Sequence, residues 1–119
     1  MAEEDGNKAA AAGTLEIEAE TRDATAWLTL RGELDLATAP ALERALAKAA
    51  GDSAPLVLDL RQLGFIDSSG LRVILSAASQ AAEAGRRLIL VRGQNQVARV
   101  LDITGSDQHL EVVDEPPTL

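Results

Sequence analysis

The spacing of apolar residues switches repeatedly between the period of a strand and the period of a helix, and this limits the fold more than any other feature. Residues 15–20 and 26–31 alternate apolar and polar side chains, which predicts strands with one buried face. Residues 56–60 are apolar except for Asp59, as is typical of a strand buried on both faces. Segments with helical spacing lie between and after these strands.

The pattern predicts the element order β-β-α-β-α-β-α-β. In chain order, the predicted helices cover residues 38–50, 68–84 and 97–104, and the further predicted strands cover residues 88–91 and 109–113. Turns are predicted at residues 21–23 and 61–64, and Gly51 is expected to end the first helix. Since helical crossovers join parallel strands, the fold class is α/β, with a mixed, mostly parallel sheet of four to five strands and at least three helices. The opening hairpin adds an antiparallel edge.

The composition predicts one folded domain with a tail at each end. The chain has 119 residues, of which 46% are hydrophobic, and this is enough for one core. Residues 1–13 combine charge, glycine and an alanine run with nothing large to bury, so we expect a disordered tail. We therefore expect a domain at residues 14–113 and a short, proline-containing C-terminal tail at residues 114–119.

The charge and the missing residue types exclude several classes of function. The formal net charge is −8, and a domain this acidic repels nucleic acid and anionic membrane surfaces. The chain has no cysteine and a single histidine, His109, so we expect no disulfide and no metal site. It contains no signal-peptide-like segment, no membrane-spanning segment and no phosphate-binding glycine motif. We expect a soluble cytoplasmic protein that needs no cofactor and binds neither nucleic acid nor membrane.

The segment Asp67-Ser68-Ser69-Gly70 joins a predicted strand to the start of a predicted helix. Asp and Ser are frequent N-cap residues, so a purely structural role is one interpretation. Only one residue can be the N-cap, however, which leaves at least one hydroxyl projecting from the first helical turn. Glycine is unfavourable inside that turn, and we interpret Gly70 as giving another surface access to the backbone. The free N–H groups of a helix start also favour a phosphate on a projecting hydroxyl.

Catalytic interpretations find less support. A nucleophile elbow requires glycine two residues before the serine, where this chain has Ile66. A Ser-His-Asp arrangement would have to use His109 from the start of a late strand. We therefore expect no catalytic residue in this chain and no enzyme activity.

A second candidate surface is Gly32-Glu33-Leu34-Asp35, between the hairpin and the first helix. Asp35 is expected to be exposed just past a strand end. An ordinary acidic loop residue is the simpler interpretation, because aspartate is common in loops.

Taken together, these segments resemble the STAS domain, and most closely its bacterial anti-sigma-factor antagonist branch. The resemblance covers about residues 14–113. It is carried by Gly32-Glu33-Leu34-Asp35 before a helix, by residues 56–60, and by Phe65-Ile66-Asp67-Ser68-Ser69-Gly70-Leu71. One departure is the C-terminal end: family members commonly continue into a further helix, for which this end is too short and too rich in proline.

The resemblance implies a switch controlled by phosphorylation. Such domains bind an anti-sigma factor that is also a serine kinase, and this frees a sigma factor for transcription. The kinase phosphorylates the first serine after the aspartate, here Ser68, and a separate serine phosphatase reverses the step. Asp67, Ser69 and Gly70 would frame the phosphosite and contact the partner, with Asp35 as a further contact.

Two other classes stay open at this point. A STAS domain can serve as an interaction module in another assembly, such as a lipid-transport or signalling complex, because a fold alone does not determine a function. A small hydrolase or nucleotide-binding protein is the third possibility.

Overall fold

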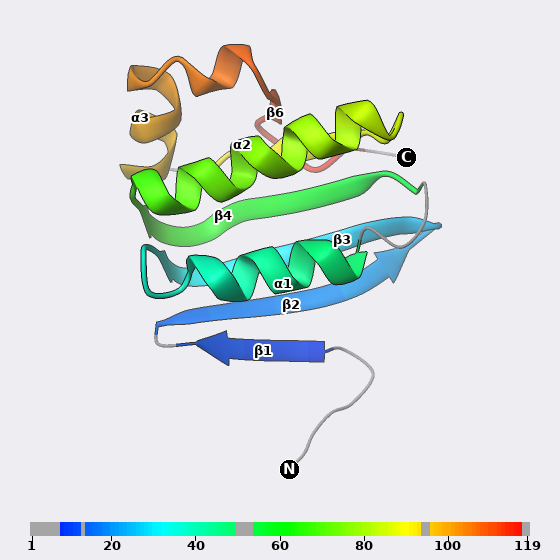
Figure 1. The fold of residues 1–119 in the computed structure, drawn as a ribbon, viewed down its shortest axis with the longest axis horizontal. Helices are drawn as coiled ribbons and strands as arrows, with labels where there is room; N and C mark the ends of the chain where they lie inside the picture. The colour runs from blue at the N-terminus through cyan, green and yellow to red at the C-terminus, as the bar shows by residue number, and fades with distance from the viewer. Residues whose placement is uncertain (1–7, 13, 50–53, 94–95, 118–119) are drawn as a thin grey trace.

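The computed structural model describes residues 8–12, 14–49, 54–93 and 96–117. In these residues, helices cover one face of a six-stranded sheet, as Figure 1 shows for α1 and α2. The strands are β1 (Lys8–Ala12), β2 (Leu15–Arg22), β3 (Thr25–Leu34), β4 (Leu56–Ile66), β5 (Leu88–Val91) and β6 (Glu111–Val113). The helices are α1 (Ala39–Ala49), α2 (Ser68–Glu83), α3 (Gln96–Ile103) and the short 3-10 helix η1 (Ser106–Gln108).

The strands lie in the sheet in their sequence order, from β1 to β6. The first three strands pair in antiparallel fashion, whereas β3, β4, β5 and β6 pair in parallel. The predicted α/β fold class, with its mostly parallel sheet and opening hairpin, is confirmed. The sheet has six strands, one more than the upper limit of the predicted four to five, and the additional strand is β1.

The N-terminal segment differs from its prediction as a disordered tail. Lys8–Ala12 pairs with Leu15–Ala19 of β2 as an edge strand, while residues 1–7 and 13 lie outside the described residues. The sequence pattern missed this strand because its four alanines have no apolar-polar alternation. Backbone pairing needs no such alternation, since it uses only N–H and C=O groups.

Two predicted turns also change. Residues 61–64 form no turn, because β4 continues to Ile66 and pairs with β3 along its length through two register shifts. The first hairpin turns at Asp23 and Ala24, both of which have positive φ, one position later than predicted. The predicted helix end at Gly51 lies outside the described residues.

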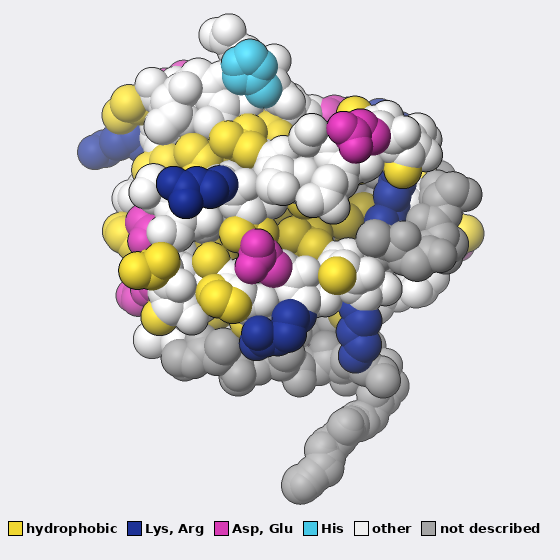
Figure 2. All heavy atoms as spheres, viewed as in Figure 1, with side chains coloured by type: hydrophobic (Ala, Val, Ile, Leu, Met, Phe, Trp, Pro, Cys, Tyr) yellow, Lys and Arg dark blue, Asp and Glu magenta, His cyan; other side chains and the backbone are white. Residues whose placement is uncertain are grey.

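The main core lies between the sheet and the helices. Leu30, Leu58, Leu60 and Ile74 are fully buried within it, together with residues of α1 and α3. Figure 2 shows the helical face from outside: both basic and acidic side chains occur on it, and hydrophobic side chains are visible in the furrow between α1 and α2. Burial of this apolar surface holds the helices against the sheet.

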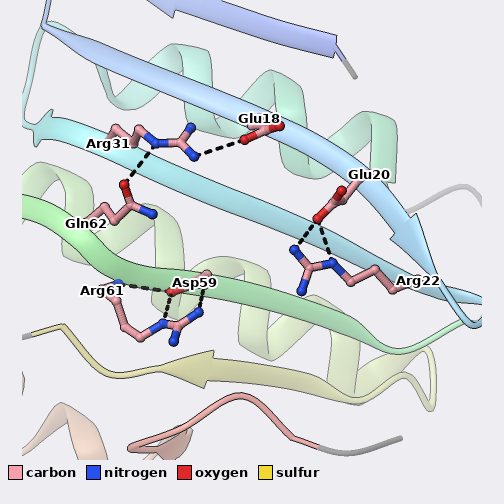
Figure 3. Close-up of polar contacts among 7 residues, drawn as sticks. All are labelled: Glu18, Glu20, Arg22, Arg31, Asp59, Arg61 and Gln62. Atoms are coloured by element: carbon pink, nitrogen blue, oxygen red, sulfur yellow. Dashed lines mark hydrogen bonds and ion pairs between the residues drawn. The ribbon is translucent and has the colours of Figure 1, made fainter. Parts of the chain in front are cut away.

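The opposite face of the sheet combines a small apolar cluster with polar contacts. Trp27, Val57, Ile89 and Val91 are buried in the cluster. Next to it, Asp59 accepts hydrogen bonds from Arg61, and Figure 3 shows this pair beside the contacts of neighbouring strands. Those contacts join Arg31 to Gln62 and Glu18, and Glu20 to Arg22. This face therefore explains why a single charged residue interrupts the apolar run of β4.

Candidate functional site

The two candidate segments from the sequence meet at the carboxyl ends of β3 and β4. Leu34 and Ile66, the last residues of these parallel strands, are partners in the sheet register. One residue further on, the backbone N–H of Asp67 donates to the carbonyl of Leu34 over 3.1 Å. The β3–α1 and β4–α2 connections are therefore neighbours, at the edge of a parallel sheet where α/β proteins commonly place their sites.

Asp67 is the N-cap of α2 and also ties the two connections together. One oxygen, Oδ1, accepts from the backbone N–H of Gly70 over 3.0 Å, and this caps the helix. The other oxygen, Oδ2, accepts from the backbone N–H of Leu36 over 3.1 Å. Both oxygens thus hold backbone groups within the domain, so Asp67 sets the position of the serine that follows it.

Ser68 is the first residue of α2 and is exposed. Ser69 follows it and is half-buried. Because Asp67 serves as the cap, the Ser68 hydroxyl is free of that role and projects from the first turn, as the sequence predicts. The start of a sixteen-residue helix provides free N–H groups and a positive dipole end near this hydroxyl.

Gly70 has a different role from the one we infer from the sequence. It is buried, and a Cβ atom at this position would lie 2.5 Å from Cγ and 3.0 Å from the carbonyl oxygen of Leu34. Leu34 itself is fully buried, so it has little room to move. Glycine is needed here because α2 packs closely on the end of β3, and the interpretation that Gly70 gives a partner access to the backbone is wrong.

Asp35 is half-buried, in contrast to the exposed position predicted for it. Its Oδ1 atom accepts from the backbone N–H groups of Ala37 and Thr38, over 3.0 and 3.1 Å. It also accepts from the Thr38 hydroxyl over 3.2 Å. Asp35 therefore shapes the turn that leads into α1, and this local bonding explains its partial burial.

Gly32, the first residue of the same motif, has a purely structural explanation. Its φ angle is +107°, and a Cβ atom would lie 1.8 Å from the carbonyl oxygen of Thr14. A residue with a side chain cannot occupy this position without a shift of the backbone. The glycine therefore allows β3 to pass close to the start of β2.

Two residues near Ser68 have no counterpart in the sequence predictions. Leu36 is 75% exposed, although its backbone is bonded to Asp67. The side-chain amide of Gln96 in α3 makes two hydrogen bonds with the backbone of Ile66. Its Nε2 atom donates to the carbonyl of Ile66, and its Oε1 atom accepts from the N–H of Ile66, each over 2.9 Å. In the sequence, the only indication of a role for Leu36 is weak: it is an apolar residue in a loop, outside any periodic pattern. The sequence gives no indication of a role for Gln96.

The geometry separates Ser68 from the histidine. His109 lies two residues before Glu111, the first residue of β6. Through β5, Glu111 is level with Val57 of β4 in the sheet register. From Val57, β4 continues for nine more residues to Ile66, which precedes the site. That length corresponds to about 30 Å of strand. His109 is thus too far from Ser68 to act as its base.

In the described part of the chain, no three His, Cys, Asp or Glu side chains form a group able to hold a metal ion. The same residues contain no helix long and apolar enough to span a membrane.

Comparison with known proteins agrees with the arrangement of strands, helices and motifs. The model of the STAS domain family matches residues 16–116. Among solved structures, an anti-sigma factor antagonist from Mycobacterium paratuberculosis superimposes with a TM-score of 0.75 at 28% identity, covering 86% of this chain and 87% of the other.

Proteins related in sequence are likewise anti-sigma factor antagonists. The chain is 31% identical over 84 residues to the anti-sigma-F factor antagonist RsfB of Mycobacterium tuberculosis, covering 70% of this chain and 68% of the relative. It is 28% identical over 85 residues to the anti-sigma-B factor antagonist of Bacillus subtilis, covering 71% and 78%. The chain therefore belongs to the STAS domain family and, within it, to the anti-sigma factor antagonists.

Proposed function

We propose that this protein binds an anti-sigma factor with serine kinase activity, and that phosphorylation of Ser68 releases it. In the unphosphorylated state the complex keeps the anti-sigma factor away from its sigma factor, which can then act in transcription. A separate serine phosphatase returns the protein to its binding state. The switch would operate in the cytoplasm, and the catalytic steps would belong to the kinase and the phosphatase.

The observation that carries the proposal is the exposed Ser68 hydroxyl at the first position of α2. The two residues that precede Ser68 are fixed by hydrogen bonds within the domain. The Asp67 carboxylate is bonded to Gly70 and Leu36, and Gln96 holds the preceding residue of β4. A kinase can therefore reach the hydroxyl without unfolding the element that carries it. The positive end of the α2 dipole supports a phosphate at this position.

The surface beside Ser68 has an exposed apolar side chain, which favours a protein as the binding partner. Leu36 exposes 75% of its surface on the neighbouring connection, which is held to Asp67 through the backbone. We call the exposed residues Leu36 and Ser68 the switch surface. A partner that covers Leu36 gains apolar burial, and the same contact brings it against the Ser68 hydroxyl.

A phosphate on Ser68 would act on this contact through charge and size. It adds about −1.5 to −2 charges at neutral pH, together with a bulky group. A partner packed over the switch surface would then bury a poorly paired charge, at a cost of several kcal/mol. We expect the domain itself to keep its structure, since Ser68 is exposed.

The experiment that tests this function is phosphorylation by the cognate anti-sigma factor in the presence of ATP, followed by mass spectrometry. We expect one phosphate, on Ser68, in the wild type and in Ser69→Ala, and none in Ser68→Ala. Ser69→Ala is the matched control, because it removes the adjacent hydroxyl. A phosphate on Ser69 with none on Ser68 would overturn the site, and no phosphate at all would overturn the mechanism.

An interaction module of a lipid-transport or signalling assembly was the other class left open by the sequence. The relatives above are named as antagonists of anti-sigma factors, and this favours the switch. A pull-down with the unphosphorylated protein distinguishes the two classes by the kind of partner that it captures.

A further inference from the structure

Arg72 lies one helical turn after Ser68 on α2, and both side chains are exposed. Residues four apart in a helix lie on the same face. Helical side chains lean toward the N-terminus, so a guanidinium at position 72 can reach the turn that begins with Ser68. The pair has the favourable order for an ion pair, with the position that would carry the anion preceding the cation.

Arg72 also lacks an acidic neighbour on its own helix. The residues three and four positions away on either side are Ser68, Ser69, Leu75 and Ser76. In the part of the chain that the structure describes, no hydrogen bond or ion pair involves its side chain, and this sets it apart from most of the other arginines. Those with a carboxylate partner are Arg22, Arg31, Arg61, Arg87 and Arg92.

A phosphate on Ser68 would need such a partner. The neighbouring Asp67 carboxylate is held in place by two backbone N–H groups and cannot turn away from a new negative charge. Repulsion between the two anions disfavours the doubly ionised phosphate. A guanidinium suits this task, because its planar array of N–H groups binds phosphate oxygens in pairs.

We propose that Arg72 pairs with phosphoserine 68 within the same chain and positions the phosphate on the α2 helix. This inference rests on the proposed function, since it concerns the phosphorylated state of the same site. The pair would hold the phosphate in a defined place over the switch surface, and it would favour the dianion near neutral pH. Arg72 is a positioning residue and takes no part in the transfer of the phosphoryl group.

The test uses full-length protein with phosphoserine incorporated at position 68 during translation, so that it depends on no kinase. Phosphorus NMR follows the second ionisation of the phosphate, whose ordinary pKa is about 6. In Arg72→Gln we expect this pKa to rise by about 0.2–0.4 pH units above the wild-type value, as for an exposed pair at this spacing. Arg72→Lys should restore at least half of the difference, which a loss of structure would not do.

Lys48→Gln is the matched control. It removes one positive charge from an exposed position in the last turn of α1, whereas Ser68 lies at the end of the sheet where α1 begins. This variant should leave the phosphate pKa at its wild-type value. The difference caused by Arg72→Gln should also nearly vanish at about 1 M salt, where the screening length falls to about 3 Å.

An unchanged phosphate pKa in Arg72→Gln, or an equal rise in Lys48→Gln, would overturn the pairing. The proposed function is tested separately with the same phosphorylated protein. If phosphoserine 68 leaves partner affinity unchanged, the switch itself fails, whatever the NMR titration gives.

Discussion

At the scale of single residues, the site separates side chains that build the frame from side chains that face outward. The carboxylates of Asp67 and Asp35 accept hydrogen bonds from backbone N–H groups in and next to the two connections. Gly70 lets α2 approach the end of β3. Ser68 and Leu36 remain exposed on this frame and are therefore available to a partner. Substitutions in the two groups should affect different properties, stability in the first and partner binding in the second.

Leu36→Ser should weaken partner binding at least about tenfold, because it removes the apolar anchor of the switch surface. Its effect on the free energy of unfolding should be small, since the side chain is 75% exposed. Isothermal titration calorimetry with the anti-sigma factor measures the affinity. The matched control is Ile103→Ser, which alters a side chain of 74% exposure at the last residue of α3. Equal losses in both variants would contradict the role of Leu36.

Gly70→Ala should lower the free energy of unfolding by about 1–2 kcal/mol, as for overpacking in a core. The new Cβ would lie 2.5 Å from Leu34 Cγ, and this clash should outweigh the better helix propensity of alanine. Urea unfolding monitored by circular dichroism measures the change. In the control Gly64→Ala, the nearest atom is 3.6 Å away, so that variant should be close to wild type. A Gly70→Ala protein of wild-type stability would show that α2 can shift without cost.

At the scale of elements, β4 is the strand on which both faces of the sheet depend. Its side chains Leu58 and Leu60 face the helices, whereas Val57 and Asp59 lie on the opposite face. The Asp59 side chain is 4% exposed, and it forms two hydrogen bonds with the guanidinium of Arg61, over 3.0 and 2.7 Å. Burial alone would raise the pKa of Asp59, but the hydrogen bonds and charge of Arg61 outweigh it, and the pKa lies below its usual value.

This pair predicts a pH-dependent part of the stability. Because the folded-state pKa of Asp59 is lowered, the ionised carboxylate stabilises the fold fully above its ordinary pKa of 3.8, and the contribution is lost as the pH falls through the folded-state value. Asp59→Asn should lower the free energy of unfolding by about 1–3 kcal/mol at pH 7, and the gap to wild type should narrow below about pH 4.

Urea unfolding at a series of pH values measures this gap. Asp114→Asn is the control, since Asp114 pairs with Arg92 on the surface with 81% of its side chain exposed, and its loss should change the stability little. A gap for Asp59→Asn that stays constant from pH 7 to pH 3 would contradict the assignment.

The sequence predicts the elements of this fold well where apolar periodicity is strong, and poorly where backbone contacts decide. Periodicity was sufficient for α2 and β5, whose sequence ranges agree with the structure within one residue. It could not predict β1, where alanines carry no pattern. At the site it predicted the exposed Ser68 but gave Gly70 the wrong role, because the contact with Leu34 joins residues 36 positions apart. Such contacts depend on how two elements pack, which local sequence does not encode.

At the scale of the whole molecule, the site lies at the carboxyl ends of the central strands β3 and β4 and is held by α2, β3 and α3 together. The Gln96 amide and the Asp67 carboxylate connect these elements through backbone groups. A phosphate at Ser68 should therefore change the surface presented to a partner and leave the core nearly unmoved. On this account the switch is an interfacial one, and its effect must be visible in affinity.

The most direct measurement is the affinity of the anti-sigma factor for wild type, Ser68→Ala and Ser68→Asp, determined side by side. Ser68→Ala should bind like the unphosphorylated wild type. Ser68→Asp should bind about a hundred- to a thousandfold more weakly, which corresponds to about 3–4 kcal/mol. Circular dichroism and unfolding curves should be alike for all three proteins. Equal affinity of Ser68→Asp and wild type, with the fold intact, would contradict the claim that charge at Ser68 controls the partner.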